Sequence, residues 1–217
     1  MTLNLQKHIH FDTLMHDPLF KNAFFLMLSY ISTAGFGFVF WMLAAKLYSA
    51  SDVGIATGII SSMTLIINFS RLGLDFSIIR FFALHDKCKV FNTSTIISTF
   101  TALIFGSIFL TSINFFSSEL LLLRSPLYEL FYFISLTSSS VIFMAGISFV
   151  AIRKAKFQLY TNLIVGSRVL LLILFVSLGA IGIFCAVGVS FFFAFVVALA
   201  LTTISGIKIK LRAATPT

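Results

Sequence analysis

The sequence predicts an all-α membrane protein, a bundle of about six transmembrane helices with both termini in the cytoplasm. Of its 217 residues, 59% are hydrophobic and only 10% are charged, whereas a soluble domain carries about 25% charged residues. A soluble fold of this length could not bury so much apolar surface, but a bilayer solvates it. The third observation is that Lys and Arg gather in alternate segments between the apolar stretches.

Six apolar stretches are each close to the ~20 residues that a helix needs to cross a bilayer. Residues suited to helix ends separate them: Ser49 can cap the second helix, Pro126 suits the first turn of the fourth, and Gly179 and Gly182 allow a tight turn before the sixth. We therefore expect one six-helix lobe over residues 1–217, with cytoplasmic tails at 1–21 and 207–217. The expected spans are residues 23–47, 53–69, 93–116, 127–152, 158–178 and 181–206.

The basic residues predict the orientation of these spans. All but three of the 15 Lys and Arg residues lie in the N-terminal tail, the C-terminal tail or the segments after the second and fourth spans. The exceptions are Lys46 and Arg124, on the opposite side, and Arg168, inside a span. Because cytoplasmic segments are enriched in Lys and Arg, this asymmetry favours two cytoplasmic termini and an even number of spans. It also explains the net charge of +8 without a nucleic-acid partner, and we expect a multi-pass protein of the plasma membrane.

The second span carries a stripe of polar residues at spacings of three or four, which places them on one helix face. Lipid would not tolerate Asn, Arg and Asp on an outward face, so we expect the stripe to point into the bundle, toward other helices or water. Helix packing through Gly54 and Gly58 is an equal alternative for its hydroxyl residues, and snorkelling to the interface is an alternative for the charged pair Arg71 and Asp75. The stripe consists of Thr57, Ser61, Thr64, Asn68, Arg71 and Asp75.

Arg168 lies near mid-depth of the fifth span. A cation there must face the bundle interior or a water-filled cavity, or reach back to the interface as an anchor. Guanidinium geometry matches phosphate, so anion binding is the functional alternative. The candidate substrate-binding residues are therefore Arg168, Arg71, Asp75 and Asn68. Since the sequence has no catalytic triad, metal-ligand cluster or phosphate-binding glycine loop, we expect no enzyme activity, metal or cofactor.

Three segments carry a resemblance to a known family. AAKLYSASDVG follows the first span, SRLGLDFSIIRF closes the second, and AIRKAKFQLYTNLIVGSRVLLLILFVSLGAIGI begins at Ala151. Together they resemble the N-terminal lobe of polysaccharide flippases, in the multidrug/oligosaccharidyl-lipid/polysaccharide exporter superfamily. The resemblance implies a transporter that moves lipid-linked oligosaccharide across the membrane for surface polysaccharide biosynthesis.

The resemblance also has consequences for partners. Family members typically have two lobes of six or seven spans, so this chain is expected to contact membrane lipids and to need a second lobe or a homo-oligomer. The alternative is a truncated or structural membrane subunit without transport activity of its own. Chain length favours that alternative, whereas the polar stripe and Arg168 favour transport.

Overall fold

The structure, a computed structural model, describes residues 18–116 and 118–207. Within these residues there is no strand, and six helical segments are long and apolar enough to cross a membrane, which confirms the predicted all-α membrane bundle. The elements are α2 (Pro18–Leu47), α3 (Ala50–Ser70), α4 (Leu74–Phe81), α5 (Lys87–Phe116), the 3₁₀ helix η1 (Ser118–Arg124), α6 (Pro126–Ala151), α7 (Ala155–Gly166), α8 (Arg168–Leu174), the 3₁₀ helix η2 (Val176–Leu178) and α9 (Ala180–Ile204).

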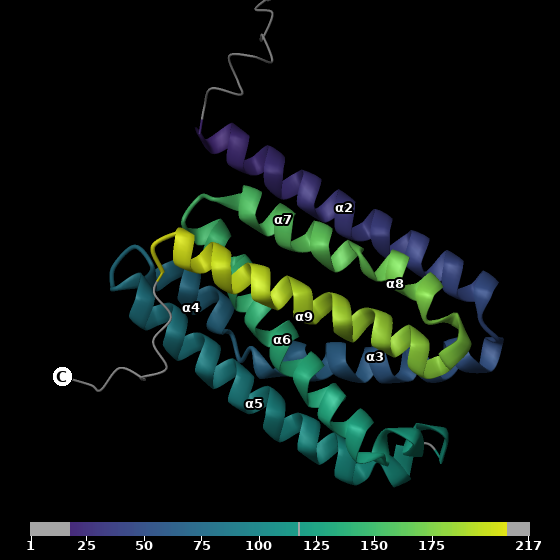
Figure 1. Cartoon of the computed structure of the whole chain (residues 1–217). Coiled ribbons are helices and arrows are strands. Elements are labelled where there is room, and N and C mark those ends of the chain that lie inside the picture. Colours follow the sequence, from purple (N-terminus) through teal and green to yellow (C-terminus); the bar gives the residue numbers. More distant parts are fainter. Residues whose placement is uncertain (1–17, 117, 208–217) are drawn as a thin grey trace, which may run out of the picture.

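The helices pack with α6 and α9 in the middle of the bundle and α2 and α5 at its edges (Figure 1). Helix α7 lies between α2 and α9, and α8 continues in nearly the same direction. The core at α6 is centred on Tyr132, which is fully buried and whose hydroxyl lies 3.0 Å from the Ser62 hydroxyl of α3. Buried aromatic and aliphatic side chains therefore hold the central helices together, while the edge helices leave much of their apolar surface for lipid.

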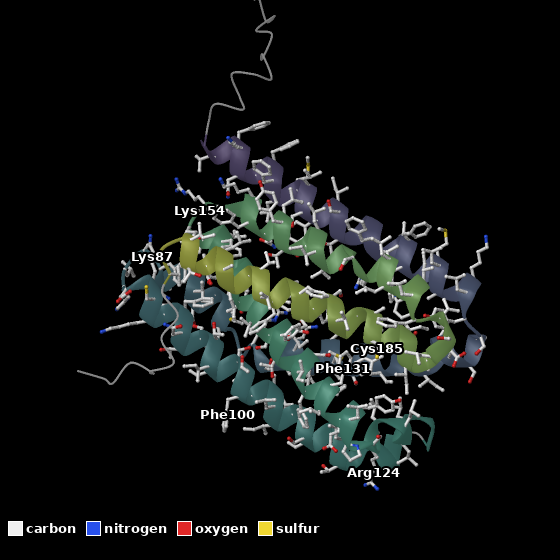
Figure 2. The ribbon with its side chains drawn as sticks, viewed as in Figure 1. Lys87, Phe100, Arg124, Phe131, Lys154 and Cys185 are labelled. Carbon is white, nitrogen blue, oxygen red and sulfur yellow. The ribbon has the colours of Figure 1, made fainter. Side chains whose placement is uncertain are left out.

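Both ends of the described chain lie at the same end of the bundle. Near the start of α2, Asn22 Oδ1 accepts a hydrogen bond of 2.8 Å from the backbone N–H of Ala155. Figure 2 shows Lys87 and Lys154 at this end and Arg124 at the other. This arrangement agrees with an even number of spans, and the cytoplasmic location of this end remains a prediction from the positive charges.

The residues expected at helix ends take those roles. Ser49 Oγ accepts a hydrogen bond of 3.1 Å from the Asp52 N–H and so caps α3, and Pro126 occupies the first turn of α6. Gly179 has a φ of 57°, which side chains disfavour. A Cβ added to Gly182 would lie only 2.1 Å from the Phe175 carbonyl oxygen. The turn before α9 therefore depends on both glycines, as the sequence predicts.

We expect Gly182→Ala to lower the free energy of unfolding by about 1–3 kcal/mol, because the crowding atom belongs to the backbone and cannot move aside as a side chain could. Gly54→Ala is the matched control, since no atom lies within 4 Å of a Cβ at Gly54 and alanine favours a helix. Thermal unfolding midpoints in one detergent compare the variants with the parent protein. Equal midpoints for the parent and Gly182→Ala would show that the turn relaxes freely.

The second expected span is continuous, whereas the fifth is interrupted. The second ends as α3 at Ser70, and the chain then passes through Leu72 and Gly73, with φ values of 47° and 77°, before α4 begins. The fifth, expected as one helix over 158–178, consists of α7, α8 and η2, with a break at Ser167. The break places Arg168 at the start of α8, in the interior of the membrane-spanning segment.

Candidate functional site

A cavity of about 350 Å³ is lined both by the end of the second span and by the fifth span. Helices α2, α6, α7 and α9 line it, and Arg71, directly after α3, and Arg168, at the start of α8, contribute the two cations. Polar groups from α2 and α7 surround these arginines, and the remaining lining, mostly from α6 and α9, is largely apolar. The polar lining consists of Tyr30, Thr33, Arg71, Gln158, Thr161, Asn162 and Arg168. The cavity thus contains two of the four candidate substrate-binding residues.

Arg168 enters the cavity beside helix α2. Its guanidinium carbon lies 5.0 Å from the centre of the Phe40 ring, and a Cβ added to Gly37 would lie 3.4 Å from Arg168 Nη2. Its Nε atom is buried and has no hydrogen-bond partner. Among the described residues no carboxylate forms an ion pair with Arg168. The guanidinium group of Arg168 therefore lies against an aromatic ring, and no carboxylate of the described residues neutralises its charge.

Arg71 lies on another wall, where the guanidinium carbon is 5.3 Å from the centre of the Phe143 ring. Arg71 Nη1 is 3.6 Å from Asp75 Oδ2, so the predicted ion pair is present. Arg71 Nη2 donates a hydrogen bond to Asn68 Oδ1. The Nε atom of Arg71, like that of Arg168, is buried without a partner. Asp75 and Asn68 are not in the cavity lining, but both contact the Arg71 side chain that is.

The polar part of the cavity is net positive and incompletely hydrogen-bonded. In addition to the two arginine Nε atoms, Gln158 Oε1 is a third buried polar atom of the cavity without a hydrogen-bond partner. A buried polar group left unpaired costs about 1–3 kcal/mol, and rotation of the Gln amide lets it present a donor as well as an acceptor. Two guanidinium groups and one carboxylate leave an excess of positive charge. This combination fits an anion with several oxygen acceptors, such as a phosphate ester.

The part of the polar stripe on α3 does not point into the bundle, so that expectation is wrong. Thr57, Ser61, Thr64 and Asn68 are all exposed on the surface of the described bundle. The hydroxyls of Thr57 and Thr64 donate to backbone carbonyls one turn earlier, at 2.6 and 2.9 Å. Because these hydroxyls are satisfied within their own helix, they need no facing helix.

The alternative of close helix packing at the two glycines of α3 also lacks support among the described residues. No atom lies within 4 Å of a Cβ added to Gly54, and the nearest atom to one at Gly58 is a side-chain carbon of Leu120, at 3.6 Å. These distances are those of open space and of ordinary contact, respectively. The stripe therefore runs along an uncovered surface from Thr57 to Asn68 and reaches the cavity at Arg71.

Sequence reasoning missed two amides in the cavity, Gln158 and Asn162 of α7. Asn162 Nδ2 donates to Ser29 Oγ of α2 at 2.7 Å, which fixes the amide at the cavity wall. A signal for both was present, since residues 158, 162, 165 and 168 follow one another at spacings of three or four. This spacing places Gln158 and Asn162 on the same helical face as Arg168.

Comparison of the chain with protein-family models, with curated proteins and with solved structures gave no match. The class of protein is therefore defined by the fold and the cavity alone, as a multi-pass membrane protein whose described residues include six helical segments able to span a bilayer and a cavity lined by two arginines. In the part of the chain that the structure describes, no three His, Cys, Asp or Glu side chains are grouped as metal ligands.

Proposed function

We propose that this chain is the transmembrane lobe of a plasma-membrane transporter that moves lipid-linked oligosaccharide across the bilayer for surface polysaccharide biosynthesis, as its resemblance to flippases implies. The observation that supports this proposal best is the cavity shared by Arg71 and Arg168, in which both Nε atoms lack partners. A diphosphate that links sugar to lipid carries about two negative charges, which need fixed cations in a low-dielectric site. The two arginines meet this requirement.

The position of the cavity suits a ligand that is part sugar and part lipid. Tyr30 and Phe143 line the cavity and are exposed at the bundle surface, so the cavity has a lateral opening. Through this opening the headgroup enters while the lipid chain stays in the bilayer. Amides and hydroxyls of Gln158, Asn162 and Thr33 supply hydrogen bonds of the kind that sugars and phosphates use.

Transport also requires the site to open alternately to the two sides of the membrane, and rocking of one lobe against another is the usual means. The exposed stripe from Thr57 to Asn68 lies next to the cavity at Arg71. A polar face of this kind is better suited to a second lobe, or to another copy of this chain, than to lipid tails. The proposed transporter therefore comprises this lobe and a partner lobe.

Photo-crosslinking of the full chain in nanodiscs tests the proposal. The probe is a polyprenyl diphosphate oligosaccharide with a photoreactive group on the sugar next to the diphosphate. We expect adducts in α6 at residues 142–147 and in α7–α8 at residues 158–168, because these segments line the cavity. Excess unlabelled diphosphate should suppress them. Adducts confined to α5, which contributes no residue to this cavity, would contradict the proposal and favour a structural subunit.

A further inference from the structure

Helix α4 packs against α5 and α6 at one end of the bundle (Figure 1). It follows the left-handed turn at Leu72 and Gly73 and precedes α5. Its inner side chain Ile78 is fully buried and belongs to one cluster with Phe91 of α5 and Met144 of α6. Because α4 is followed by Lys87, which lies at the basic end of the bundle (Figure 2), α4 lies near that end.

The opposite face of α4 is apolar and uncovered. Phe76 is 75% exposed and Ile79 is 55% exposed, and Arg80 is exposed beside them. Spacings of three and four residues place these three side chains on one face, turned away from Ile78. Exposed leucines flank the helix at Leu72 and Leu84. The segment therefore combines an apolar stripe with a cation, which is the pattern of a helix that lies in a membrane interface.

Further positive charge lies where α5 begins, shortly after α4 in the chain. Lys87 and Lys89, at the start of α5, are exposed like Arg80. The nearby acids are Asp75, which pairs with Arg71, and the exposed Asp86. The exposed charged groups of α4 and of the start of α5 therefore sum to a net positive charge, which complements anionic lipid headgroups.

We infer that the outer face of α4 lies at the boundary between lipid headgroups and acyl chains and selects anionic lipids. Phe76 and Ile79 enter the acyl region, and Arg80, Lys87 and Lys89 contact lipid phosphates. A protein partner fits less well, because a stable interface buries about 800 Å² on each side and an eight-residue helix is only about 12 Å long. The inference does not depend on transport, since it concerns a surface outside the cavity.

Tryptophan quenching by brominated lipids tests this inference in the full chain. Trp41, the single native tryptophan, is replaced by Trp41→Phe, and Phe76→Trp then places an indole on α4. We expect stronger quenching by bromine near the headgroup end of the acyl chain than by bromine near its terminal methyl. At equal mole fraction, brominated phosphatidylglycerol should quench about twofold to fivefold more than brominated phosphatidylcholine, as attraction of anionic lipid to each basic residue predicts.

The matched control is Phe100→Trp in the same background. Phe100 points away from the bundle on α5 and is 64% exposed (Figure 2), well inside the span, so deep bromine should quench it best and lipid charge should not matter. Arg80→Gln should reduce the lipid preference at Phe76→Trp. Ile79→Trp repeats the measurement at a second position. Quenching of α4 by aqueous acrylamide instead of bromine would overturn the inference, as would protection from both quenchers, which indicates a protein partner, or equal quenching by the two lipids.

Discussion

Replacing Arg168 by alanine is expected to weaken binding of a diphosphate-linked oligosaccharide by roughly 10-fold to 100-fold. Charge-assisted hydrogen bonds contribute about 1.5–3 kcal/mol, and each 1.4 kcal/mol changes a dissociation constant about tenfold. Among the described residues no carboxylate pairs with Arg168, so the bound anion would be its main electrostatic partner. Native mass spectrometry of the full chain in nanodiscs measures the affinity.

Three comparisons make the Arg168 result specific. Arg168→Lys should weaken binding partly, because the charge stays while the bidentate fork is lost. Arg124→Ala removes an exposed arginine at the other end of the bundle and should have no effect. Arg168→Ala should still insert, because removal of a charge favours insertion, but in cells it should abolish export of surface polysaccharide by the complete transporter. Normal insertion, binding and export by Arg168→Ala would show that Arg168 is only an anchor.

Substitutions of the two members of the Arg71–Asp75 ion pair are expected to change the affinity for the diphosphate ligand in opposite directions. Arg71→Ala should weaken diphosphate binding about tenfold, because it removes the second cation of the cavity. Asp75 Oδ2 lies 3.6 Å from Arg71 Nη1, so we expect the Asp75 carboxylate to compete with an anionic ligand for Arg71. Asp75→Asn should tighten binding by about twofold to fivefold, in line with the modest strength of partly exposed ion pairs. The same nanodisc measurement on both variants gives these values.

The double variant Arg71→Ala with Asp75→Asn tests whether tighter binding by Asp75→Asn arises because Asp75 competes with the ligand for Arg71. In the Arg71→Ala background Asp75→Asn should no longer tighten binding, because the carboxylate then has no arginine to neutralise. A gain of equal size in both backgrounds would instead indicate a general increase in the positive potential of the cavity. Weaker binding by Asp75→Asn alone would contradict the competitor role and assign Asp75 a direct contact with the ligand.

The sequence was sufficient to predict the spans because apolar length and charge distribution are one-dimensional properties. Each crossing needs a continuous apolar stretch, and Ser49, Pro126 and Gly179 mark helix ends through local geometry alone. The second span ends at Ser70, close to its expected end at residue 69, and Gly73 follows it in the turn before α4. The break at Ser167 had a local signal in the pair Gly166–Ser167, because Gly/Ser pairs are common places for helix kinks.

The candidate site was only partly predictable. Periodicity shows that Thr57 and Thr64 share a face, but it does not show which way that face points. Hydroxyls that bond to their own helix tolerate either environment. The depth of Arg168 was evident from its place in an apolar stretch, whereas its meeting with Arg71 in one cavity depends on tertiary packing. Charge in an apolar segment therefore made Arg168 a candidate, and the fold showed that Arg168 and Arg71 line the same cavity.

The central claim is that this cavity holds an anion, and the most direct test is the affinity of the unmodified chain for two ligands that differ only in charge. One is a polyprenyl diphosphate oligosaccharide, and the other is the same oligosaccharide joined to polyprenol without phosphate. In nanodiscs of phosphatidylcholine at fixed salt, we expect the diphosphate to bind at least about tenfold more tightly. Equal affinity for the two ligands would contradict the claim, because the arginines of the cavity would then make no contact with the diphosphate.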